Sequence, residues 1–158
     1  MDFLLLLDTS GSMYGENGEK ILGLNQAFTN FMDGLRGILP EPRLAVITYG
    51  GSSTMHDFHH ISQIAPKTYE ARGRSPLSEA TALAADIVTK NVITILISDG
   101  AADDSDYTKI SLKGPVYAIA VGADADHEQL ARFTGSPKRV LPPHAASDLP
   151  GYALQKLG

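Results

Sequence analysis

The chain alternates short, almost wholly apolar runs with longer segments in which apolar residues recur every three or four positions. Four apolar runs predict strands buried on both faces, as in a parallel sheet: residues 4–7, 43–49, 92–98 and 116–121. A more polar run at residues 54–61 follows the turn residues 50–53 and predicts a hairpin strand. We expect that strand to lie antiparallel at the sheet edge.

Helical periodicity fills the segments between these strands. One apolar stripe predicts a long helix: Ile21, Leu24, Phe28, Phe31, Leu35 and Ile38. Pro40 and Pro42 are expected to end this helix, because proline cannot continue it. A second helix is predicted to begin at Ser75-Pro76, where the sequence carries a helix-start signal.

The last third of the chain carries weaker signals. Asp126 and Gln129 have the spacing of a capping box, which predicts a helix that ends near Gly135. A short strand at residues 139–141 and a helix over residues 145–157 complete the predicted elements.

Strands that alternate with helices predict an α/β fold: an open, doubly wound, mostly parallel sheet with one antiparallel edge strand and helices on both faces. The length of 158 residues fits a single domain, residues 1–158. Ligands of such sheets bind beyond the carboxyl ends of the strands, where the strand order reverses. We therefore expect any site in the loops that follow the strands.

Composition narrows the classes of function. The net charge of -5 and the absence of a basic stripe argue against nucleic-acid binding. There is no cysteine, which excludes disulfides, thiolate metal sites and cysteine nucleophiles. The first apolar run, residues 3–7, is too short to cross a membrane and lacks the features of a signal peptide. We therefore expect a cytoplasmic protein with neither membrane nor nucleic-acid partners.

Oxygen-bearing side chains follow two of the predicted buried strands. The first strand runs into Asp8, Ser10 and Ser12, spaced as Asp-x-Ser-x-Ser, and the strand at residues 92–98 runs into Asp99. A carboxylate and two hydroxyls on one tight loop suit a hard cation. If the two strands are neighbours, both carboxylates face one crevice.

Three motifs resemble, in this order, those of the von Willebrand factor A domain and its metal-ion-dependent adhesion site: DTSGS at residues 8–12, SPL at 75–77 and ISDG at 97–100. VYAIAVG at residues 116–122 resembles that family's fifth strand, so the resemblance covers essentially the whole chain. It implies a Rossmann-like fold and these metal ligands: Asp8, Ser10, Ser12, Ser75 and Asp99. Ser75 stands where the family usually has threonine, and it keeps the hydroxyl.

The resemblance also implies an ion and a function. The implied ion is Mg²⁺, with Mn²⁺ or Ca²⁺ as alternatives, because the side chains offer oxygen but no nitrogen or sulfur. The implied activity is binding rather than catalysis, in which the ion accepts an Asp or Glu of a partner protein. The start at the first strand and the small size resemble bacterial intracellular members of the tellurium-resistance type. Those sit beside kinase-like and phosphatase-like proteins, which implies a stress-response or signalling complex.

Three other interpretations are open. In the first, Asp8 and Ser10 close a turn, Ser75 caps a helix and Asp99 ends a strand, with no shared role. In the second, the chain is a Mg²⁺-dependent phosphatase of the haloacid-dehalogenase type, although Ser10 stands where those enzymes carry a second aspartate. In the third, the chain is a scaffold that binds no metal, owing to Ser75.

Several polar residues lie outside these motifs. Strict alternation places His56 and His60 on one face of the edge strand and His59 on the other, and we interpret them as polar edge residues rather than metal ligands. Three aspartates are interpreted as a solvated loop with a helix cap, with contacts to the cation site as the alternative: Asp103, Asp104 and Asp106. Three further residues are expected to flank the proposed loops: Tyr14, Arg72 and Arg74.

Overall fold

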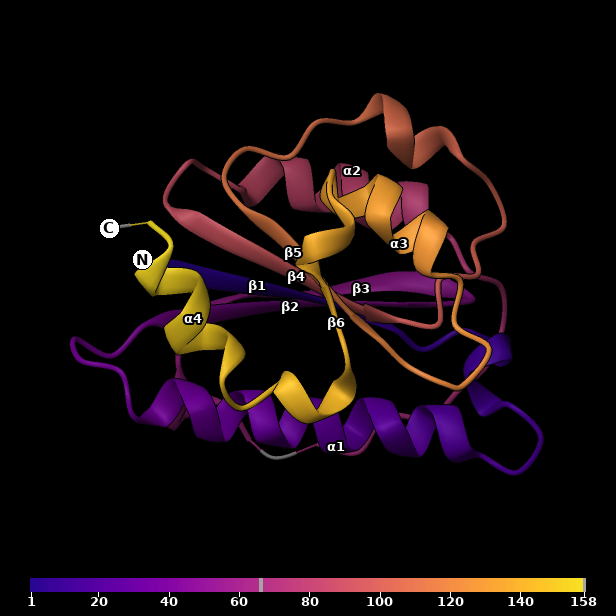
Figure 1. Cartoon of the computed structure of the whole chain (residues 1–158), viewed down its shortest axis with the longest axis horizontal. Coiled ribbons are helices and arrows are strands. Elements are labelled where there is room, and N and C mark those ends of the chain that lie inside the picture. Colours follow the sequence, from indigo (N-terminus) through magenta and orange to yellow (C-terminus); the bar gives the residue numbers. More distant parts are fainter. Residues whose placement is uncertain (66, 158) are drawn as a thin grey trace.

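A six-stranded sheet forms the centre of the molecule (Figure 1). The computed structural model describes residues 1–65 and 67–157. The strands lie in the order β3-β2-β1-β4-β5-β6, and the parallel ones are β1 (Asp2–Asp8), β2 (Arg43–Gly50), β4 (Val92–Ser98), β5 (Val116–Ala120) and β6 (Val140–Leu141). At the edge, β3 (Ser52–His60) pairs antiparallel with β2. The predicted mostly parallel sheet with one antiparallel edge strand is confirmed.

Helices cover both faces of this sheet, as predicted. One face carries α1 (Glu19–Arg36) and α4 (Leu149–Gln155), and the other carries α2 (Leu77–Ile87) and α3 (His127–Thr134) (Figure 1). The leucine run of β1 alternates between the two hydrophobic layers, since Leu5 and Leu7 pack on the α1 side and Leu4 and Leu6 on the α2 side. All four are fully buried, which explains why these four consecutive positions are apolar.

The sequence of α1 follows from the face that it buries. Four residues of the predicted stripe are buried against the sheet: Leu24, Phe28, Phe31 and Leu35. Phe31 meets Phe3 of β1 edge to face, with 5.7 Å between the ring centroids. The helix ends at Arg36, before Pro40 and Pro42 as predicted, but earlier than its predicted stripe, whose last residue Ile38 lies beyond the helix.

The strand order reverses at β1, which lies between β2 and β4. Leu7 of β1 pairs in register with Ile97 of β4, so the two strands are neighbours and run in the same direction. Asp8 and Asp99 therefore come at the same edge of the sheet, beyond the carboxyl ends of adjacent strands. This is where ligands of open α/β sheets bind.

The C-terminal helix is shorter than its prediction over residues 145–157. A 3-10 turn at Pro143–Ala145 comes first, and α4 spans only Leu149–Gln155. Pro150 explains the difference, because proline has no N–H to donate and fits only the first turn of a helix. Within the described part of the chain, none of the helices combines the length and apolar character needed to span a membrane.

The histidines of β3 do not follow strict alternation. His59 pairs with Leu44 and His56 with Val46, and the register shifts between these two pairs. Leu44 and Val46 belong to the same hydrophobic layer, so His56 and His59 share the α1 face, and their predicted placement on opposite faces is wrong. The cause is a β-bulge, which adds a residue to one strand and reverses the alternation beyond it. Both histidines line a cavity of about 410 Å³ beneath the edge strand.

Candidate functional site

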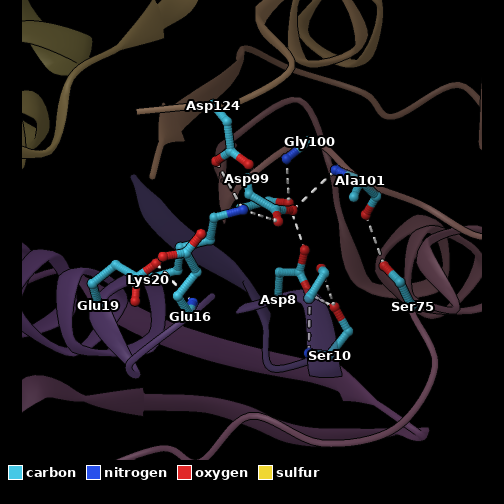
Figure 2. Close-up of polar contacts among 12 residues, drawn as sticks. Asp8, Ser10, Glu16, Glu19, Lys20, Ser75, Asp99, Gly100, Ala101 and Asp124 are labelled. Carbon is cyan, nitrogen blue, oxygen red and sulfur yellow. Dashed lines mark hydrogen bonds and ion pairs between the residues drawn. The ribbon is translucent and has the colours of Figure 1, made fainter. Parts of the chain in front are cut away.

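Asp8 ends β1 and is fully buried. Its Oδ1 accepts hydrogen bonds from the Ser10 backbone N–H at 3.0 Å and from the Ser10 hydroxyl at 2.5 Å, which closes the loop directly after the strand (Figure 2). Ser10 Oγ also lies 3.2 Å from Ser12 Oγ. The three residues of the Asp-x-Ser-x-Ser motif thus bring their side-chain oxygens into one cluster.

Asp99 directly follows β4 and is 4% exposed. Its Oδ1 accepts a hydrogen bond from the Ala101 backbone N–H at 3.0 Å, and its Oδ2 lies 3.2 Å from the Lys20 ammonium nitrogen (Figure 2). One oxygen of this carboxylate therefore orders its own loop, and the other pairs with the Lys20 ammonium of α1.

Ser75 faces the Asp99 loop rather than the helix that follows it. Its hydroxyl donates to the Ala101 carbonyl oxygen at 3.0 Å, so Ala101 connects Ser75 to Asp99 (Figure 2). The residue before α2 is Pro76, and the structure gives that helix no side-chain cap bond. The interpretation of Ser75 as a simple helix cap is therefore wrong.

Backbone hydrogen bonds hold the loop before Ser75 against the loop after β1. The Arg72 N–H donates to the Thr9 carbonyl at 2.8 Å, and the Gly11 N–H donates to the Gly73 carbonyl at 2.8 Å. Gly73 has a φ of +79°, and a Cβ there would lie 2.5 Å from the Gly51 Cα, so only glycine fits. Arg72 and its neighbours thus flank the Asp-x-Ser-x-Ser loop, as predicted.

The environment of Asp8 disfavours its charge. Burial raises the pKa of Asp8 to about 6, the hydrogen bonds from Ser10 and Ser98 offset part of that rise, and the negative charge of Asp99 adds to it. Among the residues that the structure describes, no Lys, Arg or His forms an ion pair with this carboxylate. A cation placed beside Asp8 would favour its ionised form.

The donor atoms fit a hard divalent cation. The five candidate side chains offer two carboxylates and three hydroxyls, which suits Mg²⁺, Mn²⁺ or Ca²⁺ rather than zinc or copper. In the described ranges, no group of three or more Asp, Glu or His side chains is placed to hold a metal ion. A metal bound at this edge of the sheet would therefore need the hydroxyls of Ser10, Ser12 and Ser75 as well as the two carboxylates.

Two residues of the site were not predicted from the sequence. The Ser98 hydroxyl donates to Asp8 Oδ2 at 2.6 Å and accepts from the Gly100 N–H at 2.9 Å. The available signal was the position of Ser98 at the end of the predicted strand 92–98. In the structure Leu7 pairs with Ile97, which puts Ser98 level with Asp8. Lys20 had no such signal, since its contact depends on how α1 packs across the sheet.

Two of the aspartates after Asp99 form hydrogen bonds to the segment around Ser75, which the predicted solvated loop did not include. Asp103 Oδ2 accepts from the Ser75 N–H at 2.9 Å and from Arg74 Nε at 3.1 Å. Asp104 Oδ2 accepts from the Ser78 hydroxyl at 2.9 Å. The loop is exposed, as predicted, and the Asp103 carboxylate in addition fixes the backbone of Ser75, one of the candidate ligands.

Comparisons of the sequence give no relative. No protein-family model matches the chain, and no curated protein has a similar sequence at a significant level.

Comparisons of the structure do find similar folds. An aerotolerance-related membrane protein from Bacteroides fragilis is 12% identical, with 99% of each chain covered and a TM-score of 0.69. The manganese-loaded TRAP protein of Plasmodium vivax is 17% identical, with 94% of this chain and 71% of that chain covered and a TM-score of 0.75. A von Willebrand factor type A protein from Catenulispora acidiphila is 13% identical, with 92% and 40% covered and a TM-score of 0.68. The chain therefore has the fold of von Willebrand factor type A domains.

Proposed function

We propose that this chain is a divalent-cation-dependent protein-binding module. Asp8, Ser10, Ser12, Ser75 and Asp99 are the proposed ligands of one ion, with Mg²⁺ as the first choice and Mn²⁺ or Ca²⁺ as alternatives. Such an ion supplies a positive centre to which an Asp or Glu side chain of a partner protein can bind. The chain's own residues hold the loops in place, and the activity is binding rather than turnover.

The observation that carries this proposal is the convergence of three loops that are far apart in sequence. Asp8 accepts hydrogen bonds from Ser10 and Ser98. Asp99 and Ser75 both form hydrogen bonds with the backbone of Ala101. Burial raises the pKa of Asp8, so a cation at this position relieves an unfavourable buried charge. The manganese carried by a protein of similar fold, TRAP, supports including Mn²⁺ among the ions to be tested.

The rim of the site supports access by another protein. Gly11 and Ser12 are exposed, as are three side chains that were expected to flank these loops: Tyr14, Arg72 and Arg74. Two of these are arginines, which are suited to hold a partner's acidic segment by paired hydrogen bonds. For the partner we propose a kinase-like or phosphatase-like protein of a cytoplasmic stress-response or signalling complex, the class implied by the resemblance to tellurium-resistance proteins.

Calorimetric titration with Mg²⁺ and Mn²⁺ tests the metal. We expect saturable binding of at least one ion to the wild-type chain and its loss in Asp8→Ala. Asp86→Asn, which changes an exposed aspartate of α2, is the matched control and is expected to bind as the wild type does. An absence of heat with both ions would contradict the proposal and favour a scaffold without metal.

Partner capture from a lysate of the source organism tests the function. The immobilised wild-type chain is expected to retain a protein in Mg²⁺ that chelator releases. Folded Asp8→Ala is expected to retain none of it, and Asp86→Asn to retain all of it. Retention that neither chelator nor Asp8→Ala changes would show that binding does not pass through the ion.

A further inference from the structure

Lys20 lies between two carboxylates at the edge of the candidate site. Its ammonium nitrogen is 3.2 Å from Asp99 Oδ2 and 2.9 Å from Asp124 Oδ1 (Figure 2). The side chain of Lys20 is 12% exposed, that of Asp99 is 3% exposed and that of Asp124 is 74% exposed. Lys20 therefore joins a buried candidate ligand to a carboxylate that stands in solvent.

The packing around Lys20 holds its side chain in this position. Gly122 follows β5 with a φ of +95°, and a Cβ there would lie 3.0 Å from Lys20 Cε and 3.2 Å from Asp124 Oδ1. A Cβ at Gly23 would lie 3.1 Å from Val121 Cγ1, so glycine also lets the first turns of α1 approach the end of β5. Glycine at both positions thus leaves room for the lysine stem between helix and strand.

Glu19 fixes the start of the helix that carries Lys20. Its carboxylate accepts hydrogen bonds from the Glu16 N–H at 3.0 Å and from the Asn17 N–H at 2.8 Å (Figure 2). These bonds order the turn before α1. The position of the Lys20 ammonium is therefore set by the turn before it as well as by the packing around its stem.

We propose that Lys20 is an intramolecular cation that competes with the divalent ion for Asp99, and that Asp124 accepts the ammonium when the ion binds. Lys20 then sets the affinity and selectivity of the site, although it is not a ligand. This inference rests on the proposed metal-binding function. It adds a residue that weakens ion binding and so makes it responsive to ion concentration.

The charges at the site explain the competition. The candidate ligands carry two negative charges, and the Lys20 ammonium reduces their sum by one; the affinity of oxygen sites for divalent ions depends strongly on ligand charge. Asp99 is too buried to move with the ammonium, whereas Asp124 is largely in solvent and can pair with it farther from the ion. The pair with Asp124 thus gives the displaced charge a partner.

Calorimetric titration of the full chain with Mg²⁺ and with Mn²⁺ tests this proposal in four variants. Lys20→Met keeps the apolar stem and removes the charge, and we expect about tenfold tighter binding. Asp124→Asn leaves the ammonium with Asp99 alone, and we expect about tenfold weaker binding. Lys109→Met removes the same charge from an exposed side chain that pairs with Asp106 rather than with a candidate ligand, and it is expected to change affinity less than about twofold.

The fourth variant, which combines Lys20→Met with Asp124→Asn, separates competition from a general charge effect. If Asp124 acts through Lys20, Asp124→Asn has little effect on affinity in the Lys20→Met background, so the two changes are strongly non-additive. Thermal unfolding in chelator accompanies each titration and checks that every variant is folded.

Each outcome has one meaning. Tighter binding by Lys20→Met together with non-additivity supports the competition. Unchanged or weaker binding by folded Lys20→Met overturns it and leaves the metal proposal standing, because the wild type still binds. No binding by any variant, Lys20→Met included, overturns both the metal proposal and this inference.

Discussion

The two aspartates that end adjacent strands have opposite surroundings. Asp8 is the last residue of the central strand β1, and both of its oxygens accept hydrogen bonds from uncharged groups of Ser10 and Ser98. Asp99 follows the neighbouring strand β4, and one of its oxygens binds the ammonium of Lys20. Both residues are buried, so the difference lies in the charge of the partner.

This difference shows that hydrogen bonds from uncharged donors do not fully offset the cost of burying a carboxylate charge. Three donors surround Asp8, yet burial still raises its pKa to about 6. At Lys20, burial lowers the pKa of the ammonium, but Asp124 and Asp99 outweigh burial and raise it, so its charge is held firmly. An added cation would therefore stabilise the charge of Asp8, whereas the charge of Asp99 is already paired with the Lys20 ammonium.

The largest expected change in the free energy of unfolding comes from the ionisation of Asp8 as the pH rises. The pKa of this carboxyl is 3.8 in the unfolded chain, and burial raises it to about 6 in the folded protein. The stability that it contributes is complete below pH 3.8 and is lost as the pH rises through 6. In chelator at pH 7, Asp8→Asn is therefore expected to be more stable than the wild type by about 3 kcal/mol, with equal stabilities near pH 4.

Urea denaturation at several pH values between 4 and 7 measures this effect. The control is Asp86→Asn, whose curve is expected to run parallel to that of the wild type, because this aspartate is exposed. Parallel curves for Asp8→Asn and wild type would show that the Asp8 carboxylate is as well solvated in the fold as in the unfolded chain.

Asp99→Asn is expected to destabilise the protein, in contrast to Asp8→Asn. The change removes the negative charge beside Lys20 and leaves its ammonium with the exposed Asp124 alone, so the free energy of unfolding falls by about 2 kcal/mol in chelator at pH 7. Urea denaturation measures the loss. Adding Lys20→Met to Asp99→Asn is expected to restore part of it, and a loss that stays the same would show that the ion pair is not its cause.

The shared position of Asp8 and Asp99, unlike the difference in their surroundings, rests on elements that the amino-acid sequence predicts. Apolar runs that stop at Asp8 and Asp99 predict parallel strands, and parallel strands place both carboxylates at one edge of the sheet. The resemblance to von Willebrand factor A domains added Ser75, whose loop is far from either strand in sequence. The fold class and the convergence of these three loops therefore follow from local patterns and the resemblance, whereas the adjacency of β1 and β4 was a condition that the structure supplied.

The features that the sequence did not reveal depend on packing between elements or on a local irregularity. Lys20 reaches Asp99 because α1 lies close to the end of β5, and no spacing along the chain records that approach. The bulge that moves His59 to the α1 face breaks an alternation that is otherwise regular. Pro150 was present in the sequence, and its rule against helix interiors would have shortened the predicted C-terminal helix.

A smaller effect is expected from Ser98, which connects the two halves of the site. Ser98→Ala removes the donor to Asp8 Oδ2 and the acceptor for the Gly100 N–H, at a cost of about 1–2 kcal/mol in unfolding free energy at pH 7. Since that hydrogen bond lowers the pKa of Asp8, its loss should raise this pKa further and move the pH dependence upward. NMR titration of the Asp8 carboxyl carbon measures the shift, and an unchanged midpoint would contradict the role given to Ser98.

The smallest effect is expected from Ser75→Thr, which restores the residue usual in the resembling family. The threonine hydroxyl can still donate to the Ala101 carbonyl, so the free energy of unfolding should change by less than about 0.5 kcal/mol. The added methyl restricts the side-chain rotamer, and we expect Mg²⁺ binding to become tighter by less than about threefold. Calorimetric titration measures this, with Ser75→Ala as the comparison that loses the hydroxyl. A gain of a hundredfold with threonine would mean that serine is a defective ligand here, and the Asp99 half of the site would then be limited by Ser75 rather than by Lys20.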